Sequence, residues 1–135
     1  FVMVYGESLS DQVEQGTNFA AVDAGADIIS HPGLIDAETA AFAAEKGVAL
    51  EFTSCPRHAL ANAHTARLAL EHGAALVRGS ASTCAEELTT RALWPMIVKG
   101  SDVFGMTQNT SNLLELLIKS EERLARKLMR SGLAR

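Results

Sequence analysis

The sequence predicts an α/β fold in which parallel strands alternate with helices, and two observations lead to this prediction. Four glycines recur at spacings of 22, 26 and 27 residues, about one strand–helix unit each: Gly25, Gly47, Gly73 and Gly100. A helix-like stretch precedes each glycine, and a short apolar run follows it. Glycine ends helices because it adopts the left-handed conformation without a Cβ penalty. Short apolar runs are typical of strands that are covered on both faces.

About five strands are expected along the chain, one in the segment that opens at Phe1 and four after the glycines. These four runs are Ala26–Ser30, Val48–Thr53, Ala74–Val77 and Ser101–Phe104. Strands that alternate with helices imply a parallel sheet with right-handed crossovers.

The expected helices lie between and after these strands. They are Thr17–Ala24, Ala37–Lys46, Ala61–His72, Glu86–Val98 and Asn112–Met129. Asp36 is placed to cap the second helix by accepting an orphan backbone N–H bond. Pro95 is expected to kink or end the fourth helix. The last helix has a basic end, which complements the negative helix C-terminus and favours a solvated end over a binding patch.

Two architectures fit this alternation: a doubly wound open sheet and a segment of a closed (β/α) barrel. A complete barrel takes about 200–250 residues, so residues 1–135 would form the C-terminal part of a single barrel domain. We therefore expect N-terminal strands upstream of Phe1, or another copy of the chain, to complete it. Because exposed strand edges promote aggregation, we predict a homo-oligomer or association with an N-terminal segment.

Composition excludes several classes of protein. A formal net charge of −4 argues against nucleic acid as the main partner. The sequence has no apolar run of the roughly 18 residues that a membrane helix needs. Cys55 and Cys84 are too few for a disulfide framework. We favour two reduced thiols in a cytoplasmic protein over a zinc site that these cysteines would form near His31.

Candidate site residues lie after the expected strands, because chemistry in both architectures occurs at strand C-terminal ends. His31 ends a strand and is followed at once by Pro32, so its imidazole is expected to point into the mouth, although it could instead bond a neighbouring loop. Glu7 has a similar place and could ligate a cation or act as a base. Arg57 and Arg78 could clamp a phosphate by bidentate bonds, or pair with carboxylates.

These residues resemble the PHP (polymerase and histidinol phosphatase) family, most closely its small stand-alone histidinol-phosphatase-like members. The resemblance extends to about Leu88, roughly two-thirds of the chain. Its stretches are Tyr5–Glu7, Gly16–Asn18, Ala26–Ile35, Gly47–Glu51 and Arg57–His64. The His-Pro-Gly turn at His31 and the His-x-x-x-Asn-x-His spacing from His58 are its most specific parts.

The resemblance implies a distorted (β/α) barrel that hydrolyses phosphate esters with zinc, manganese or iron ions at its strand ends. It implies that His31 and Glu7 are metal ligands with catalytic roles and that His58 is a further catalytic residue. Asn62 and His64 would line the substrate site. Arg57 and Arg78 would then contact the phosphate of a phosphorylated small molecule.

Three positions depart from the family pattern. Tyr5 stands where the family has a histidine before Gly6 and Glu7. Ala81 and Thr83 stand where the family has an Asp-x-His pair, and the opening His-x-His motif would lie upstream of Phe1. A catalytic zinc normally takes three protein ligands, so the chain itself retains too few donors to hold a catalytic divalent metal.

Three hypotheses follow from this sequence. The chain could belong to an active metal-dependent phosphoesterase that obtains further ligands upstream. It could be a non-catalytic descendant that binds a phosphorylated small molecule or a protein partner. It could also be an ordinary open α/β domain whose histidines cluster by coincidence. The missing ligands favour the degenerate site slightly over the active one.

Overall fold

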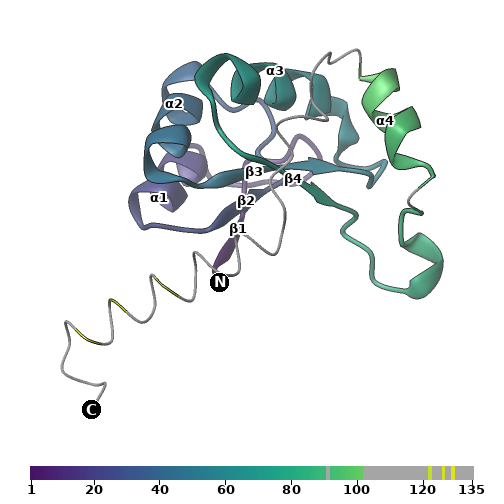
Figure 1. The fold of residues 1–135 in the computed structure, drawn as a ribbon, viewed down its shortest axis with the longest axis horizontal. Helices are drawn as coiled ribbons and strands as arrows, with labels where there is room; N and C mark the ends of the chain where they lie inside the picture. Colours follow the sequence, from purple (N-terminus) through teal and green to yellow (C-terminus); the bar gives the residue numbers. More distant parts are fainter. Residues whose placement is uncertain (91, 102–121, 123–125, 127–128, 130–135) are drawn as a thin grey trace.

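The computed structural model describes residues 1–90, 92–101, 122, 126 and 129, and a parallel sheet forms its centre (Figure 1). Four strands are found among these residues: β1 (Met3–Tyr5), β2 (Ile28–Ser30), β3 (Ala49–Thr53) and β4 (Leu76–Gly79). The strands pair in sequence order, and every pairing is parallel. The predicted α/β alternation is therefore confirmed.

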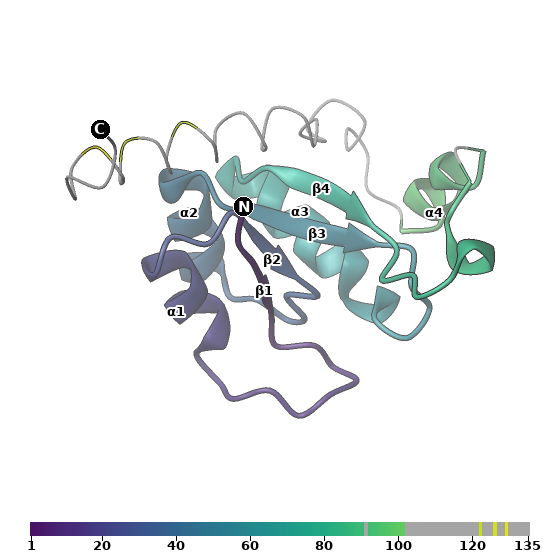
Figure 2. The same ribbon diagram turned by 90° about the horizontal axis from the view of Figure 1, so that it is seen from below.

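Three helices connect consecutive strands and lie on one face of the sheet (Figure 2). They are α1 (Thr17–Asp23), α2 (Ala37–Lys46) and α3 (Asn62–His72), the last preceded by a short 3-10 turn, η1 (Ala59–Ala61). Helix α1 packs on α2, and α2 packs on α3. Within the described ranges, no helix is long and apolar enough to cross a bilayer.

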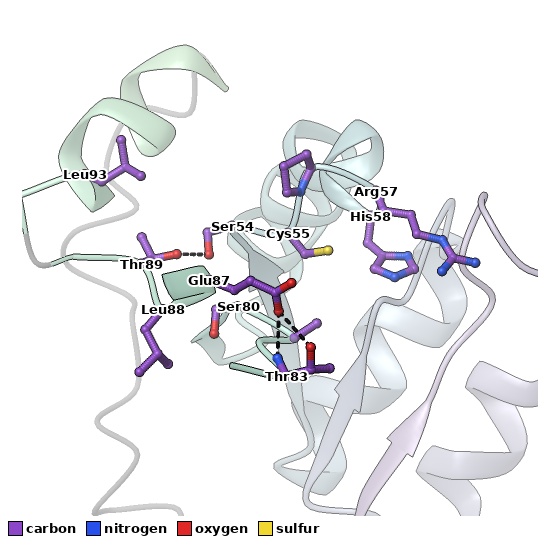
Figure 3. A pocket seen from close by; sticks show the side chains of 12 residues that line it. Ser54, Cys55, Arg57, His58, Ser80, Thr83, Glu87, Leu88, Thr89 and Leu93 are labelled. Carbon is purple, nitrogen blue, oxygen red and sulfur yellow. Dashed lines mark hydrogen bonds between the residues drawn. The ribbon is translucent and has the colours of Figure 1, made fainter. Parts of the chain in front are cut away.

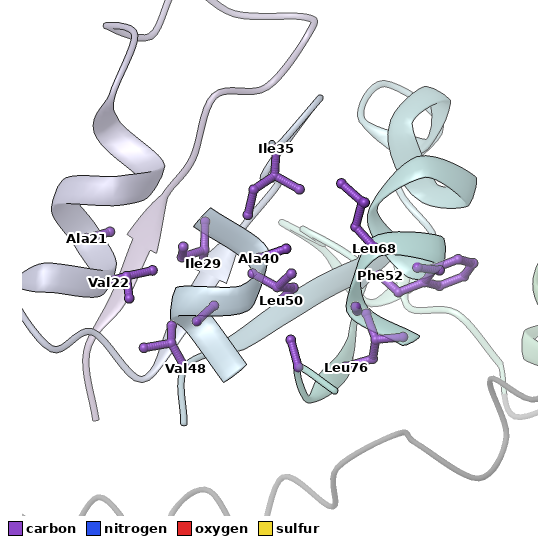
Figure 4. Close-up of a cluster of buried hydrophobic side chains, with 14 of the residues drawn as sticks. Ala21, Val22, Ile29, Ile35, Ala40, Val48, Leu50, Phe52, Leu68 and Leu76 are labelled. Atoms are coloured by element: carbon purple, nitrogen blue, oxygen red, sulfur yellow. The ribbon is translucent and has the colours of Figure 1, made fainter. Parts of the chain in front are cut away.

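The hydrophobic core lies between the sheet and these helices (Figure 4). Alternate residues of a strand point to opposite faces, so Leu50 and Phe52 of β3 join the helix-side core. Ala49 packs on the other face with Ile28 and Val77. All five residues of β3 are buried. Burial of both faces explains why this strand reads as a nearly continuous apolar run.

The helix predicted over Glu86–Val98 is found only in its last part, because α4 begins at Trp94. Ala85–Glu87 form a single 3-10 turn, η2, and Leu88 is extended. Helix α4 runs from Trp94 to Gly100. Pro95 therefore lies in the first turn of α4, where its missing N–H is not needed, rather than at a kink.

The predictions for the end of the chain fall largely on residues that the structure does not describe. Gly100 is the last residue of α4 and not a glycine that follows a helix. Of the expected strand Ser101–Phe104, Ser101 lies in a turn and residues 102–104 are outside the described residues. Most of the expected helix Asn112–Met129 is also outside them.

Asp36 caps α2 as predicted. Its carboxylate accepts from the backbone N of Thr39 at 2.7 Å and from the Thr39 hydroxyl at 2.8 Å. The backbone bond is the main reason that the pKa of Asp36 is lowered.

Replacing Asp36 by Ala is expected to cost about 1 kcal/mol of unfolding free energy. Because the folded-state pKa is lowered, the cap contributes above the ordinary value of 3.8 and is lost as the pH falls through the folded pKa. Urea denaturation of D36A and D36N across the acid range checks this. D36N should keep most of the capping energy and lose its pH dependence. Equal stability of D36A and the parent protein at neutral pH would contradict the assignment.

Candidate functional site

The candidate site lies at the mouth of the sheet, meaning the C-terminal ends of the strands and the loops that follow them. His31 follows β2 directly and is 5% exposed. Its φ of 51° lies in the left-handed region, which is uncommon for a residue other than glycine. Bonds on either side hold this turn: Gly6 N donates to Ser30 O at 2.7 Å, and Asn18 Nδ2 donates to Pro32 O at 2.8 Å. The surrounding fold therefore maintains a strained backbone at His31.

His31 and His58 come together at this mouth, as their positions after neighbouring strands suggested. Their rings stack with centroids 4.0 Å apart and planes 20° apart. The ring of Tyr5 stands edge-on to both, at 5.1 Å from His31 and 6.0 Å from His58. The Ser8 hydroxyl lies 2.8 Å from His58 Nδ1, and the Tyr5 hydroxyl lies 3.5 Å from His58 Nε2. Residues after β1, β2 and β3 therefore share one site.

Glu51 supports this pair from the middle of β3. Its side chain is 6% exposed, and Oε2 accepts the backbone N–H of His31 at 3.0 Å. The same oxygen lies 3.0 Å from His31 Nδ1, yet that nitrogen is buried without a hydrogen-bond partner. Gly79 of β4 makes room for the carboxylate, because a Cβ there would lie 1.6 Å from Glu51 Oε1. Glu51 was given no role in the sequence analysis. Its position as a single charged residue inside an apolar strand could have marked it as part of a site.

Burial controls the ionisation of this cluster. It is the main cause that lowers the pKa of His31 and that of His58, and the neighbouring His31 lowers the pKa of His58 further. Burial also raises the pKa of Glu51. All three shifts disfavour the charged form. The approach of His31 to Glu51 is therefore a contact between desolvated groups rather than a strong ion pair.

The loop between β1 and α1 contributes Asp11 to this site, a residue that the sequence analysis did not single out. Asp11 forms an ion pair with Arg57 and accepts a hydrogen bond from the Tyr5 hydroxyl. The Ser10 hydroxyl donates to the backbone carbonyl of Arg57. Arg57 is thus placed beside His58, and its guanidinium already has a carboxylate partner. No local pattern in the sequence marked Asp11 for this contact.

Glu7 and Asn62 lie near the mouth but bind backbone groups. Glu7 Oε1 accepts from Gly16 N at 3.0 Å and from Asn18 N at 2.9 Å, at the start of α1. Asn62 is buried, accepts from Thr53 N at 3.1 Å and donates to Thr53 O at 2.7 Å. These contacts fix the start of α1 and the end of β3, respectively.

His64 and Arg78 lie away from the stacked histidines. His64 Nε2 is 2.7 Å from the carbonyl oxygen of Ile35, which ties α3 to the loop before α2. The Arg78 guanidinium lies over the ring of Trp94, 5.7 Å from its centroid. Among the described contacts, neither residue reaches the candidate site. The structure therefore groups His31 and His58 with Arg57 and places His64 and Arg78 elsewhere.

A cleft of about 500 Å³ opens beside His58, between the loops after β3 and β4 (Figure 3). Polar residues from both loops line it, joined by apolar residues from the segment before α4. They are Ser54, Cys55, Pro56, Arg57, His58, Ser80, Ala81, Thr83, Glu87, Leu88, Thr89 and Leu93. Ala81 and Thr83, at the positions where family ligands were expected, thus lie in its wall. Cys55 also lines it, and both cysteines are free thiols.

The stacked pair of His31 and His58 does not fit the divalent metal that the resemblance implies. A cation bound by imidazole lies about 2.0–2.1 Å from the ring nitrogen, along a lone pair in the ring plane. The ring planes of His31 and His58 are only 20° apart and their centroids are 4.0 Å apart. The two planes therefore do not intersect within bonding distance of both ring nitrogens. In the part of the chain that the structure describes, no three His, Cys, Asp or Glu side chains are grouped to hold a metal. His31 and His58 as placed therefore do not share a cation.

The fold and site define an α/β protein with a polar site at the C-terminal ends of parallel strands. No family model matches the chain. The chain is similar to an uncharacterized protein of Methanocaldococcus jannaschii, with 40% identity over 73 residues. The match covers 53% of this chain and 34% of the relative, so it spans about a third of that protein's length.

Proposed function

We propose that this chain is part of a PHP-like barrel whose mouth binds a phosphorylated small molecule and has lost metal-dependent hydrolysis. The stacked pair of His31 and His58 supports this proposal most directly. Two parallel imidazoles do not converge on one cation, but each ring nitrogen that carries a proton can donate to an anion. The site would therefore recognise a phosphate ester through N–H and O–H donors.

The arrangement of strands and helices supports the barrel part of this proposal. In a doubly wound sheet the strand order reverses and helices cover both faces. Strands β1 to β4 instead follow one another in sequence order, and α1, α2 and α3 share one face. Consecutive strands with helices outside are the rule in (β/α) barrels. A barrel of the PHP type would need further strands beside β1 and β4.

The cleft supplies the remaining chemistry for a phosphorylated ligand. Arg57 and His58 lie on one side of it, opposite Thr89 and Leu93 (Figure 3). Ser80 and Thr83 bring hydroxyl groups from the loop after β4, and Leu88 and Leu93 add an apolar surface. Ligand sites commonly combine an apolar lining with a few polar groups that fix orientation. We expect the phosphate near Arg57 and the rest of the ligand along the apolar side.

The competing function is an active phosphoesterase. His31 Nδ1 favours it, because this buried ring nitrogen makes no hydrogen bond and lies 3.0 Å from the Glu51 carboxylate, so that both could serve as ligands. Such an enzyme would need rearranged rings and ligands from outside the described residues.

Metal analysis of the full-length protein, together with an assay on phosphomonoesters, tests the two functions. We expect less than stoichiometric zinc, manganese or iron, no turnover, and binding of phosphorylated compounds. Stoichiometric metal with turnover would establish the enzyme instead. In that case His31→Ala should strip the metal, whereas His64→Ala, which changes a histidine that bonds a backbone carbonyl, should leave it bound. Metal retained in H31A would remove His31 from the metal site.

A further inference from the structure

We infer that Asp11 occupies, from within the molecule, the subsite that receives the ligand's phosphate, so that ligand binding exchanges the Asp11 carboxylate for the phosphate. This inference rests on the proposed function. It adds where the phosphate binds and which side chain competes with the phosphate for that place. A side-chain carboxylate held by cationic and hydroxyl donors marks where the fold has built an anion site.

The donors around Asp11 come from separate parts of the chain. The Arg57 guanidinium, on the loop after β3, pairs with Oδ1, while the Tyr5 hydroxyl, at the end of β1, donates to Oδ2. His58 adds an imidazole whose Nε2 is 3.5 Å from that hydroxyl. Guanidinium and hydroxyl groups that bind a carboxylate bind phosphate oxygens by the same charge-assisted bonds. A phosphate has more oxygens than a carboxylate and can engage these donors together.

The exposure of the pair allows this exchange. The Arg57 side chain is 65% exposed, and that of Asp11 is 30% exposed. Solvent-exposed ion pairs contribute little to stability, so releasing Asp11 does not require the core to open. Arg57 also lines the cleft, so a ligand there can reach the guanidinium without crossing the protein.

The segment Ser8–Asp11 would move with the exchange. It is held by four contacts: Ser8 with His58, Ser10 with the Arg57 carbonyl, and Asp11 with both Arg57 and Tyr5. Losing both contacts of Asp11 frees the end of the segment, while Ser8 stays on His58 and Ser10 on the Arg57 carbonyl. Ligand binding is therefore expected to change the environment of this loop as well as that of Arg57.

Titration with inorganic phosphate and with phenyl phosphate, followed by calorimetry and by amide chemical shifts of the loop, tests the inference. The variants are D11N, which keeps the shape of Asp11 but removes its charge, and R57Q, which removes the guanidinium. Glu14→Gln is the matched control, because Glu14 is an exposed acid on the same loop. Thermal melting confirms that each variant is folded. We expect D11N to bind phosphate at least about fivefold more tightly than the parent protein, E14Q to bind like the parent, and R57Q to lose binding.

Each outcome decides the inference. Binding by D11N that is no tighter than that of E14Q would overturn it, because the gain would then reflect net charge alone. If the parent protein binds phenyl phosphate and R57Q binds it equally well, the inference fails while the proposed function stands. If none of the four proteins binds either compound, both fail. Tighter binding by D11N that depends on Arg57 supports the exchange.

Discussion

Replacing Gly33 by alanine is expected to prevent stable folding of the chain. Gly33 has a φ of 61°, and a Cβ at this position would lie 1.8 Å from the carbonyl oxygen of Glu7 and 2.8 Å from its carbon. These are backbone atoms, and the bond from Gly6 N to Ser30 O holds their loop against this turn. Moving the loop would also displace His31. We expect a loss of more than about 4 kcal/mol of unfolding free energy, measured by urea denaturation or as loss of soluble protein.

Gly47→Ala is the matched control for this prediction. Gly47 has a φ of 70°, close to that of Gly33, but a Cβ there meets nothing within 4 Å. G47A should therefore show the conformational cost alone, about 1–2 kcal/mol. Equal losses in G33A and G47A would mean that the approach of Gly33 to Glu7 does not matter.

Replacing Glu51 by alanine is expected to destabilise the protein, whereas replacing it by glutamine is not. E51A leaves the buried N–H of His31 without its acceptor, at a cost of about 1–3 kcal/mol, and it also opens a space above Gly79. E51Q keeps both the size of the side chain and an acceptor oxygen, and it removes a buried charge. Replacing buried charges is often neutral or stabilising. Denaturation midpoints of the two variants at neutral pH check this contrast.

The pH dependence of E51Q gives a second test of the same carboxyl. Burial raises the pKa of Glu51, so the folded state favours the protonated form. The parent protein should therefore lose stability as the pH rises above the ordinary value of 4.5 and through the folded pKa, while E51Q should not. The lowered pKa of His31 acts in the opposite sense, reducing stability as the pH falls below 6.5. It acts in both proteins and largely cancels in their difference. A stability gap that does not widen with pH would contradict the burial of an ionisable Glu51.

The elements that could be predicted from the sequence are those whose ends are marked by neighbouring residues, such as a capping side chain or a glycine. Helix α2 begins and ends where Asp36 and Gly47 placed it, because a capping carboxylate and a left-handed glycine act within one turn. The first part of the helix predicted over residues 86–98 is not found, and a tertiary contact is made there instead. The Thr89 hydroxyl bonds the Ser54 hydroxyl at the end of β3, and the preceding Leu88 is extended. Nothing in the local sequence encodes a bond between residues 35 positions apart.

The candidate site was predictable to a similar extent. His31 and His58 follow adjacent parallel strands, and parallel topology brings the ends of such strands to one edge of the sheet. The direction of a loop side chain depends on the loop's own conformation, which is why Glu7 and His64 bond backbone groups instead. Asp11 reaches Arg57 across 46 residues of sequence. That contact exists only once β1 and β3 are in one sheet.

The strand order has a consequence for how the chain can acquire its structure. Since β1 to β4 pair in sequence order, each pairing closes a loop of a single strand–helix unit. The entropy of closing a loop grows slowly with its length, so no pairing in this sheet is much harder to form than the one before it. Each new strand can dock on its predecessor as it leaves the ribosome, without waiting for a distant segment. The pairing of His58 with the turn that holds His31 would then form as β3 docks, before β4 and the loop after it complete the cleft.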